Sequence, residues 1–283
     1  MVIQTSAGRS LKPSQFSKAF DGALKLAKDC ECELEDFRKD IVKVACLLIE
    51  EGLDLTTFLH KSILNYHAAA FIKELPDERA TSFYAAATNE FRKWQSTLSF
   101  LRLIDEARYA NHYYLNIVAE PHSKLRDALD APGDISFYNY FMSLSPGISA
   151  GLQGSVLVAW GPTPQNRNEI EEEIDSVIIR LIVNLFTRLS PQDLNELKSK
   201  SHTKILEGTD TVRIPLKAII EFFGLDKFRD ALRTYENTTY NTIEKYKVIV
   251  HNESIQKSIF DDILGSASAG NSPAKKRIPS RKR

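Results

Sequence analysis

Cysteine is scarce in this chain of 283 residues, which contains only Cys30, Cys32 and Cys46. Three cysteines cannot complete a disulfide framework, and Cys30-x-Cys32 lacks the two-residue spacer of common zinc and redox motifs. The first ten residues also lack the apolar core of a secretory signal. We therefore expect a reducing intracellular compartment and no bound metal.

Long apolar runs are also missing. A membrane-spanning helix needs roughly 18 consecutive apolar residues, and Arg180 interrupts the longest apolar segment of the chain. The sequence therefore predicts no membrane span.

The chain has no recognisable catalytic motif. Gly147, Gly151 and Gly154 form neither a GxGxxG pattern nor a P-loop, and the six histidines are scattered. We expect neither an enzyme nor a cofactor. The competing hypothesis, an enzyme that uses the Gly- and Pro-rich residues 146–164, requires a pocket there lined by titratable groups.

The most apolar segment, residues 168–190, organises the rest of the predicted fold. Its apolar residues recur at three- and four-residue steps, as on an α-helix with a wide buried face. Asn168 and several acidic residues stand at its start, where carboxylates favour the positive end of the helix dipole. This segment is predicted to be the central helix of a helical core.

The same periodicity predicts helices through most of the chain, and therefore an all-α fold. Helices are expected from Pro13, from about Glu33 to Gly52, and from Asp54 to Leu75, where Pro76 breaks the pattern. Further helices are predicted from about Asp134, for residues 191–206, from Pro215 to Gly224, from Asp226, and for residues 253–264. Two short stretches stay open between strand and helix: residues 156–158 and 240–250.

Residues 79–120 contain neither proline nor glycine and predict one long helix or two helices joined by a kink. Six apolar residues form a seam with alternating four- and three-residue steps: Phe83, Ala87, Phe91, Trp94, Leu98 and Leu101. Because the seam is short and Asp105 interrupts it, packing within the chain is favoured over an intermolecular coiled coil.

The domain organisation follows from the turn signals. Pro132-Gly133 predicts a turn, and either one compact body or two helical lobes that meet there. The predicted parts are a flexible leader at residues 1–12, an N-terminal lobe at 13–131, a C-terminal lobe at 132–265 and a disordered basic tail at 266–283.

The tail is the most distinctive feature of the sequence. It carries six basic residues and no acid after residue 270: Lys275, Lys276, Arg277, Arg281, Lys282 and Arg283. Because the whole chain has 37 basic and 37 acidic residues, the remainder is acidic. The clusters are typical of a nuclear localisation signal read by an import receptor, or of a phosphate-binding segment. Ser272-Pro273 also fits a kinase site, where a phosphate would add negative charge.

A second cationic feature lies on the central helix, where Ser176, Arg180, Asn184 and Arg188 recur every four residues and share one face. With Lys198 and Lys204, this polar stripe could hold the phosphates of a nucleic acid. The alternative is that an acid such as Glu173 neutralises Arg180. Aromatic clusters at Tyr109, Tyr113 and Tyr114 and at residues 137–141 could stack on bases, but core packing is the favoured interpretation.

These features lead to one main hypothesis and one alternative. The main hypothesis is a non-enzymatic structural protein of the nucleus and cytoplasm, nucleocapsid-like in role: the helical body self-associates, and the stripe and tail contact single-stranded RNA or another nucleic acid. The alternative is a protein-interaction adaptor or matrix-type scaffold with a nuclear localisation tail and no nucleic-acid binding.

Overall fold

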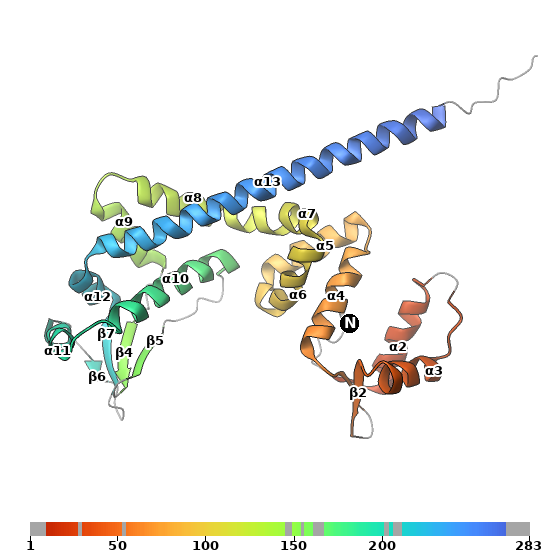
Figure 1. Cartoon of the computed structure of the whole chain (residues 1–283), viewed down its shortest axis with the longest axis horizontal. Helices are drawn as coiled ribbons and strands as arrows, with labels where there is room; N and C mark the ends of the chain where they lie inside the picture. Colours follow the sequence, from red (N-terminus) through yellow and green to blue (C-terminus); the bar gives the residue numbers. More distant parts are fainter. Residues whose placement is uncertain are drawn as a thin grey trace, which may run out of the picture.

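Helices form most of the protein, so the predicted all-α fold is confirmed (Figure 1). The computed structural model describes residues 10–27, 30–52, 55–144, 149–153, 156–160, 167–200, 204–205 and 211–269. The α-helices are α2 (Pro13–Leu24), α3 (Leu34–Lys39), α4 (Lys61–Lys73), α5 (Asp77–Asn89), α6 (Phe91–Ile104), α7 (Glu106–Tyr109), α8 (Leu115–Asp130), α9 (Asp134–Leu144), α10 (Glu169–Phe186), α11 (Pro191–Lys200), α12 (Leu216–Phe223) and α13 (Leu225–Ala269), with π-helical turns η1 (Asp40–Val44) and η2 (Ala110–Tyr114).

Two small antiparallel sheets supplement the helices. The first has the strand order β1-β3-β2 and contains β1 (Ser10–Leu11), β3 (Leu55–Phe58) and β2 (Leu48–Glu51). The second has the order β5-β4-β7-β6 and contains β5 (Val156–Trp160), β4 (Ser149–Gln153), β7 (Thr211–Pro215) and β6 (Lys204–Ile205). The open choice at residues 156–158 is therefore resolved as a strand.

The first sheet corrects two predicted helices. Residues 48–51 were expected to end a helix and instead form β2, which pairs with β3 in the register Ile49 to Thr57. The helix expected from Asp54 begins at Lys61, where the His60 ring accepts a hydrogen bond from the Ser62 amide at 3.2 Å. Gly52 has φ +66°, a conformation in which glycine is favoured, and reverses the chain rather than ending a helix.

Residues 77–130 form several helices rather than one, because the helical conformation is interrupted twice. Glu90 and Asp105 leave the helical conformation, with ψ of 38° and 45°, and so separate α5, α6 and α7. The apolar seam therefore runs over two helices, and its packing within the chain is confirmed because Ala87, Trp94 and Leu101 are buried.

One large core joins helices from both predicted lobes. Buried residues of α4 to α10, α12 and α13 form a single cluster, in which α10 contributes Ile170, Ile174, Ile178, Ile182 and Phe186 at four-residue steps. A smaller cluster centred on Leu11, Phe16 and Leu48 holds α2, α3 and the first sheet together. The division into two lobes at residue 132 stays a prediction.

Helix α13 is a single element where the sequence predicted two. It continues through residues 240–250 and past Gly265 to Ala269, so the first residues of the predicted tail are helical. Its first half packs against α8 and α10. Figure 1 shows its last turns projecting well beyond the body.

Candidate functional site

The polar stripe on α10 lies on the face opposite the buried one. Ser176, Arg180 and Asn184 are exposed, and Arg188 is exposed just after the end of the helix. The Arg180 guanidinium donates from Nε to the carbonyl oxygen of Ser176 at 3.2 Å. The two arginines are eight residues apart, or about 12 Å along the helix axis, so one extended anion could contact both.

Within the described chain, no carboxylate neutralises these two arginines. The predicted partner of Arg180, Glu173, instead accepts a hydrogen bond from the Tyr235 hydroxyl at 3.0 Å. Several other arginines of the body form ion pairs with acidic side chains: Arg92 with Glu172, Arg167 with Asp175, Arg229 with Asp134, and Arg233 with Asp130. Among the described residues, Arg180 and Arg188 have no such ion pair, and the prediction that Glu173 pairs with Arg180 is wrong.

The other predicted basic residues are only partly placed. Lys198 belongs to α11, and Lys204 lies on β6 opposite Arg213 of β7, but the structure describes neither lysine side chain. Ser272 and the basic residues Lys275, Lys276, Arg277, Arg281, Lys282 and Arg283 lie outside the described residues. The structure therefore brings Arg180 and Arg188 to one face, and the role of the other residues stays a prediction.

A second exposed surface carries large apolar side chains and lies on what we call the distal segment, residues 251–260 of α13. Its side chains are exposed except for Glu253, which is half-buried. Ile255, Ile259 and Phe260 are 43%, 53% and 64% exposed. Because isolated helices are marginal in water, a projecting helix with large apolar side chains is typical of a protein-binding surface.

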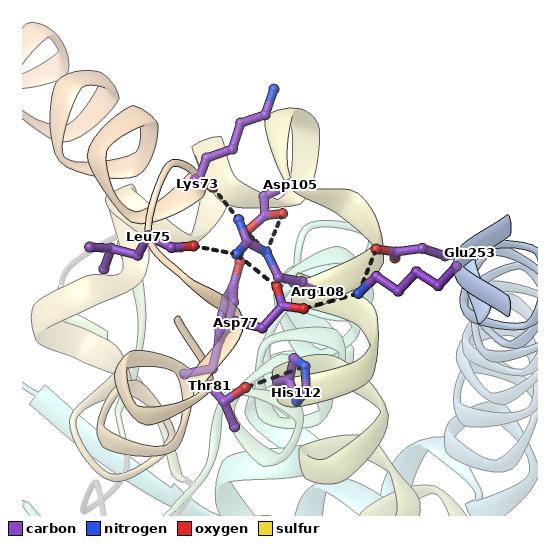
Figure 2. Close-up of polar contacts among 10 residues, drawn as sticks. Lys73, Leu75, Asp77, Thr81, Asp105, Arg108, His112 and Glu253 are labelled. Carbon is purple, nitrogen blue, oxygen red and sulfur yellow. Dashed lines mark hydrogen bonds and ion pairs between the residues drawn. The ribbon is translucent and has the colours of Figure 1, made fainter. Parts of the chain in front are cut away.

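Arg108 organises the polar contacts that hold α13 beside the body (Figure 2). Its guanidinium donates to Asp105 at 2.9 Å and to the carbonyl oxygen of Leu75 at 2.9 Å, and it also reaches the carbonyl oxygen of Lys73. A second carboxylate, Asp77, lies 3.3 Å from Arg108 and accepts a hydrogen bond from Lys257 of the distal segment at 3.1 Å.

The effect of these contacts appears in the electrostatics of Asp77. The ammonium of Lys257, with help from Arg108, holds the pKa of the Asp77 carboxyl below its ordinary value. The contacts therefore connect the turn between α4 and α5 to the distal segment through one carboxylate. Sequence reasoning missed this cluster, for which the break at Asp105 was the only signal.

The aromatic cluster near η2 belongs to the core. Tyr109 and Tyr113 are at most 5% exposed, and Phe137 and Phe141 are fully buried. The prediction of core packing is confirmed for these residues, so they offer no platform for stacking on bases.

Glu169 starts α10 beside this cluster and accepts a hydrogen bond from the Tyr113 hydroxyl at 2.8 Å. Burial raises the pKa of the Glu169 carboxyl above its ordinary value, and the nearby Glu173 adds to the rise. The folded state therefore holds a proton more tightly than the unfolded chain does. Stability from this group is present below the unfolded pKa of about 4.3 and is lost as the pH rises through the raised folded pKa.

We expect Glu169→Gln to remove this pH dependence, because the amide oxygen can still accept the Tyr113 hydrogen bond without a buried charge. Urea unfolding from pH 4 to pH 7 should show that the variant loses less stability than the wild type over this range. Tyr113→Phe is the comparison variant, and it should lower the free energy of unfolding by about 1–3 kcal/mol, since it removes the hydroxyl that donates to Glu169. Identical pH profiles for wild type and Glu169→Gln would contradict the assignment.

Three further findings complete the description of possible sites. In the described part of the chain, no group of three or more histidine, cysteine, aspartate or glutamate side chains could hold a metal ion. None of the described helices combines the length and apolar character needed to cross a membrane. Comparison with known proteins finds no family model, curated protein or solved structure that matches the chain.

Proposed function

We propose that this chain is a non-enzymatic structural protein that binds nucleic acid through the exposed arginines of α10 and the basic residues 275–283, while its helical body self-associates. The observation that carries the proposal is the exposure of Arg180 and Arg188 without an ion pair to a described carboxylate. Guanidinium groups suit this role because their forked donors match phosphate oxygens. The aromatic side chains of the core stay buried, so the binding would be independent of sequence and sensitive to salt.

A second candidate function, a protein-interaction adaptor, is supported by the apolar distal segment of α13. It predicts that residues 275–283 serve only as a nuclear import signal. Both proposals place the protein in the nucleus and cytoplasm, so binding to nucleic acid separates them.

The test is binding of labelled single-stranded RNA and DNA by the chain truncated after Gly270, measured by fluorescence anisotropy over a salt series. We expect binding to survive truncation and to weaken with salt. In the truncated chain, Arg180→Glu with Arg188→Glu should make the plot of log affinity against log salt less steep. The magnitude of its negative slope should fall by about 1.4, at about 0.7 per phosphate contact on a single strand.

The matched control reverses two charges elsewhere on the body, Lys61→Glu with Arg79→Glu. Both residues are exposed, and neither forms an ion pair with a described residue. This control should retain the wild-type salt slope. If truncation abolishes binding, or if the two double variants bind alike, the α10 face is not the phosphate site and the adaptor function is favoured.

A further inference from the structure

An open apolar groove lies in the N-terminal part of the protein, between α2, α3 and the first sheet. It has a volume of about 440 Å³ and is lined by apolar side chains, with Lys18 as its charged member; the lining includes Phe16, Phe20, Leu26, Phe37, Ile41 and Phe58. Leu26 is 59% exposed. A groove of this kind takes the apolar face of an amphipathic helix.

The distal segment of α13 is a helix that fits this description. Ile255 and Ile259 are four residues apart and share one face of the helix, and Phe260 stands about 100° around the helix axis from Ile259. The ten residues of the segment span about 15 Å, and the twelve residues of α2, which forms one wall of the groove, span about 18 Å.

The two surfaces are kept apart within one copy of the chain. Lys257 of the distal segment is held at 3.1 Å from Asp77 of α5, and Lys245 lies 2.6 Å from Glu106 of α7. Figure 1 shows α2 and α3 below α4, whereas the end of α13 projects past α5 on the other side of the body. The distal segment therefore cannot enter its own groove while these contacts persist.

We propose that the distal segment of α13 inserts into the apolar groove of a second copy of this chain. This contact would bring basic residues near acidic ones. Lys18 and Lys25 are exposed on and just after α2, and in the sequence Asp261 and Asp262 directly follow Phe260. Each copy would use its helix on one neighbour and its groove on another, a heterologous contact that generates rings or open filaments.

The inference gives a structural basis for the self-association part of the proposed function and does not involve the α10 arginines. Its test, sedimentation velocity in buffer without nucleic acid, therefore fails independently of the RNA-binding experiment. We expect the mass of the wild type to increase with concentration beyond that of a dimer. A helix variant, Ile259→Gln with Phe260→Gln, should weaken association on the order of 100-fold, since two buried anchors are lost.

A groove variant, Ala23→Glu with Leu26→Asp, should also be monomeric. Because each variant keeps the surface that the other lacks, an equimolar mixture should form a species with the mass of two chains and no larger one. The control, Leu103→Gln with Ile135→Gln, replaces apolar residues that are 76% and 78% exposed elsewhere and should associate as the wild type does. Circular dichroism should show wild-type helicity in all variants.

Two results would overturn the proposal. A groove variant that still associates like the wild type would show that distal segments pair with each other or use another surface. A wild type that stays monomeric over the whole concentration series would show that the groove and the helix bind something other than a second copy.

Discussion

Replacing Arg108 with alanine is expected to lower the free energy of unfolding by about 3–5 kcal/mol, the usual cost of removing one partner of a buried ion pair. The side chains of Arg108 and Asp105 are only 11% and 10% exposed. Without the guanidinium, Asp105 keeps one donor, the Tyr84 hydroxyl at 2.9 Å. The carbonyl oxygens of Lys73 and Leu75 also lose the donor that they share.

Chemical denaturation of Arg108→Ala at neutral pH measures this effect. The control is Arg92→Ala, which removes an ion pair with Glu172 whose side chains are 48% and 30% exposed, and it should cost no more than about 1 kcal/mol. Arg108→Lys should fall between the two, because an ammonium restores the charge but not the forked donor geometry that reaches two elements at once. Equal losses for Arg108→Ala and Arg92→Ala would show that the cluster in Figure 2 is not a buried ion-pair network.

The helices of the core were predictable because their apolar periodicity and their end signals agree. At the start of α10, the side-chain oxygen of Asn168 accepts a hydrogen bond from the backbone N–H of Glu171 at 3.0 Å. The Glu171 carboxylate in turn accepts one from the backbone N–H of Asn168 at 3.1 Å. The local sequence therefore predicts both the start of the helix and the face that it buries. The turn at Gly133 and the end of α12 at Gly224, where φ is +89° and +86°, were also predictable from the sequence.

The first sheet could not be predicted, because its strands are fixed by pairing rather than by local preference. Leu48 continues the apolar pattern of the helix predicted from about Glu33, and the two glutamates that follow Ile49 are not favoured in strands. Pairing of β2 and β1 with the two edges of β3 supplies backbone hydrogen bonds that none of these short strands could form alone. Helix α13 likewise departs from its local signal, because it continues past Gly265, where the sequence predicted an end.

For the candidate site, the spacing of Arg180 and Arg188 predicted their common face but not their lack of ion pairs. The acids that neutralise other arginines come from distant parts of the sequence, as with Arg92 and Glu172. Only the three-dimensional structure shows which arginines already form ion pairs with acidic side chains. The Arg108 cluster could not be predicted for the same reason, since its acceptors include two backbone carbonyl oxygens at the end of α4, those of Lys73 and Leu75.

Tyr246→Ala is the second substitution with a large expected effect, a loss of about 3–5 kcal/mol, as for other buried aromatic residues replaced by alanine. Tyr246 is 2% exposed. Its ring meets those of Tyr114 and Tyr109 edge to face, with centroids 5.0 Å and 6.1 Å away. It is the last buried residue of α13 before the distal segment, so its removal should also detach that segment from the body.

Two measurements check both parts of this prediction. Urea unfolding should show the full loss for Tyr246→Ala and a change within about 0.5 kcal/mol for Val248→Ala, which replaces a residue 57% exposed two positions along the same helix. Hydrogen exchange should show faster exchange of residues 247–260 in Tyr246→Ala only, because a helix end without a packed anchor frays. Similar exchange in both variants would mean that the ion pair of Lys257 with Asp77, and not the tyrosine cluster, holds the distal segment in place.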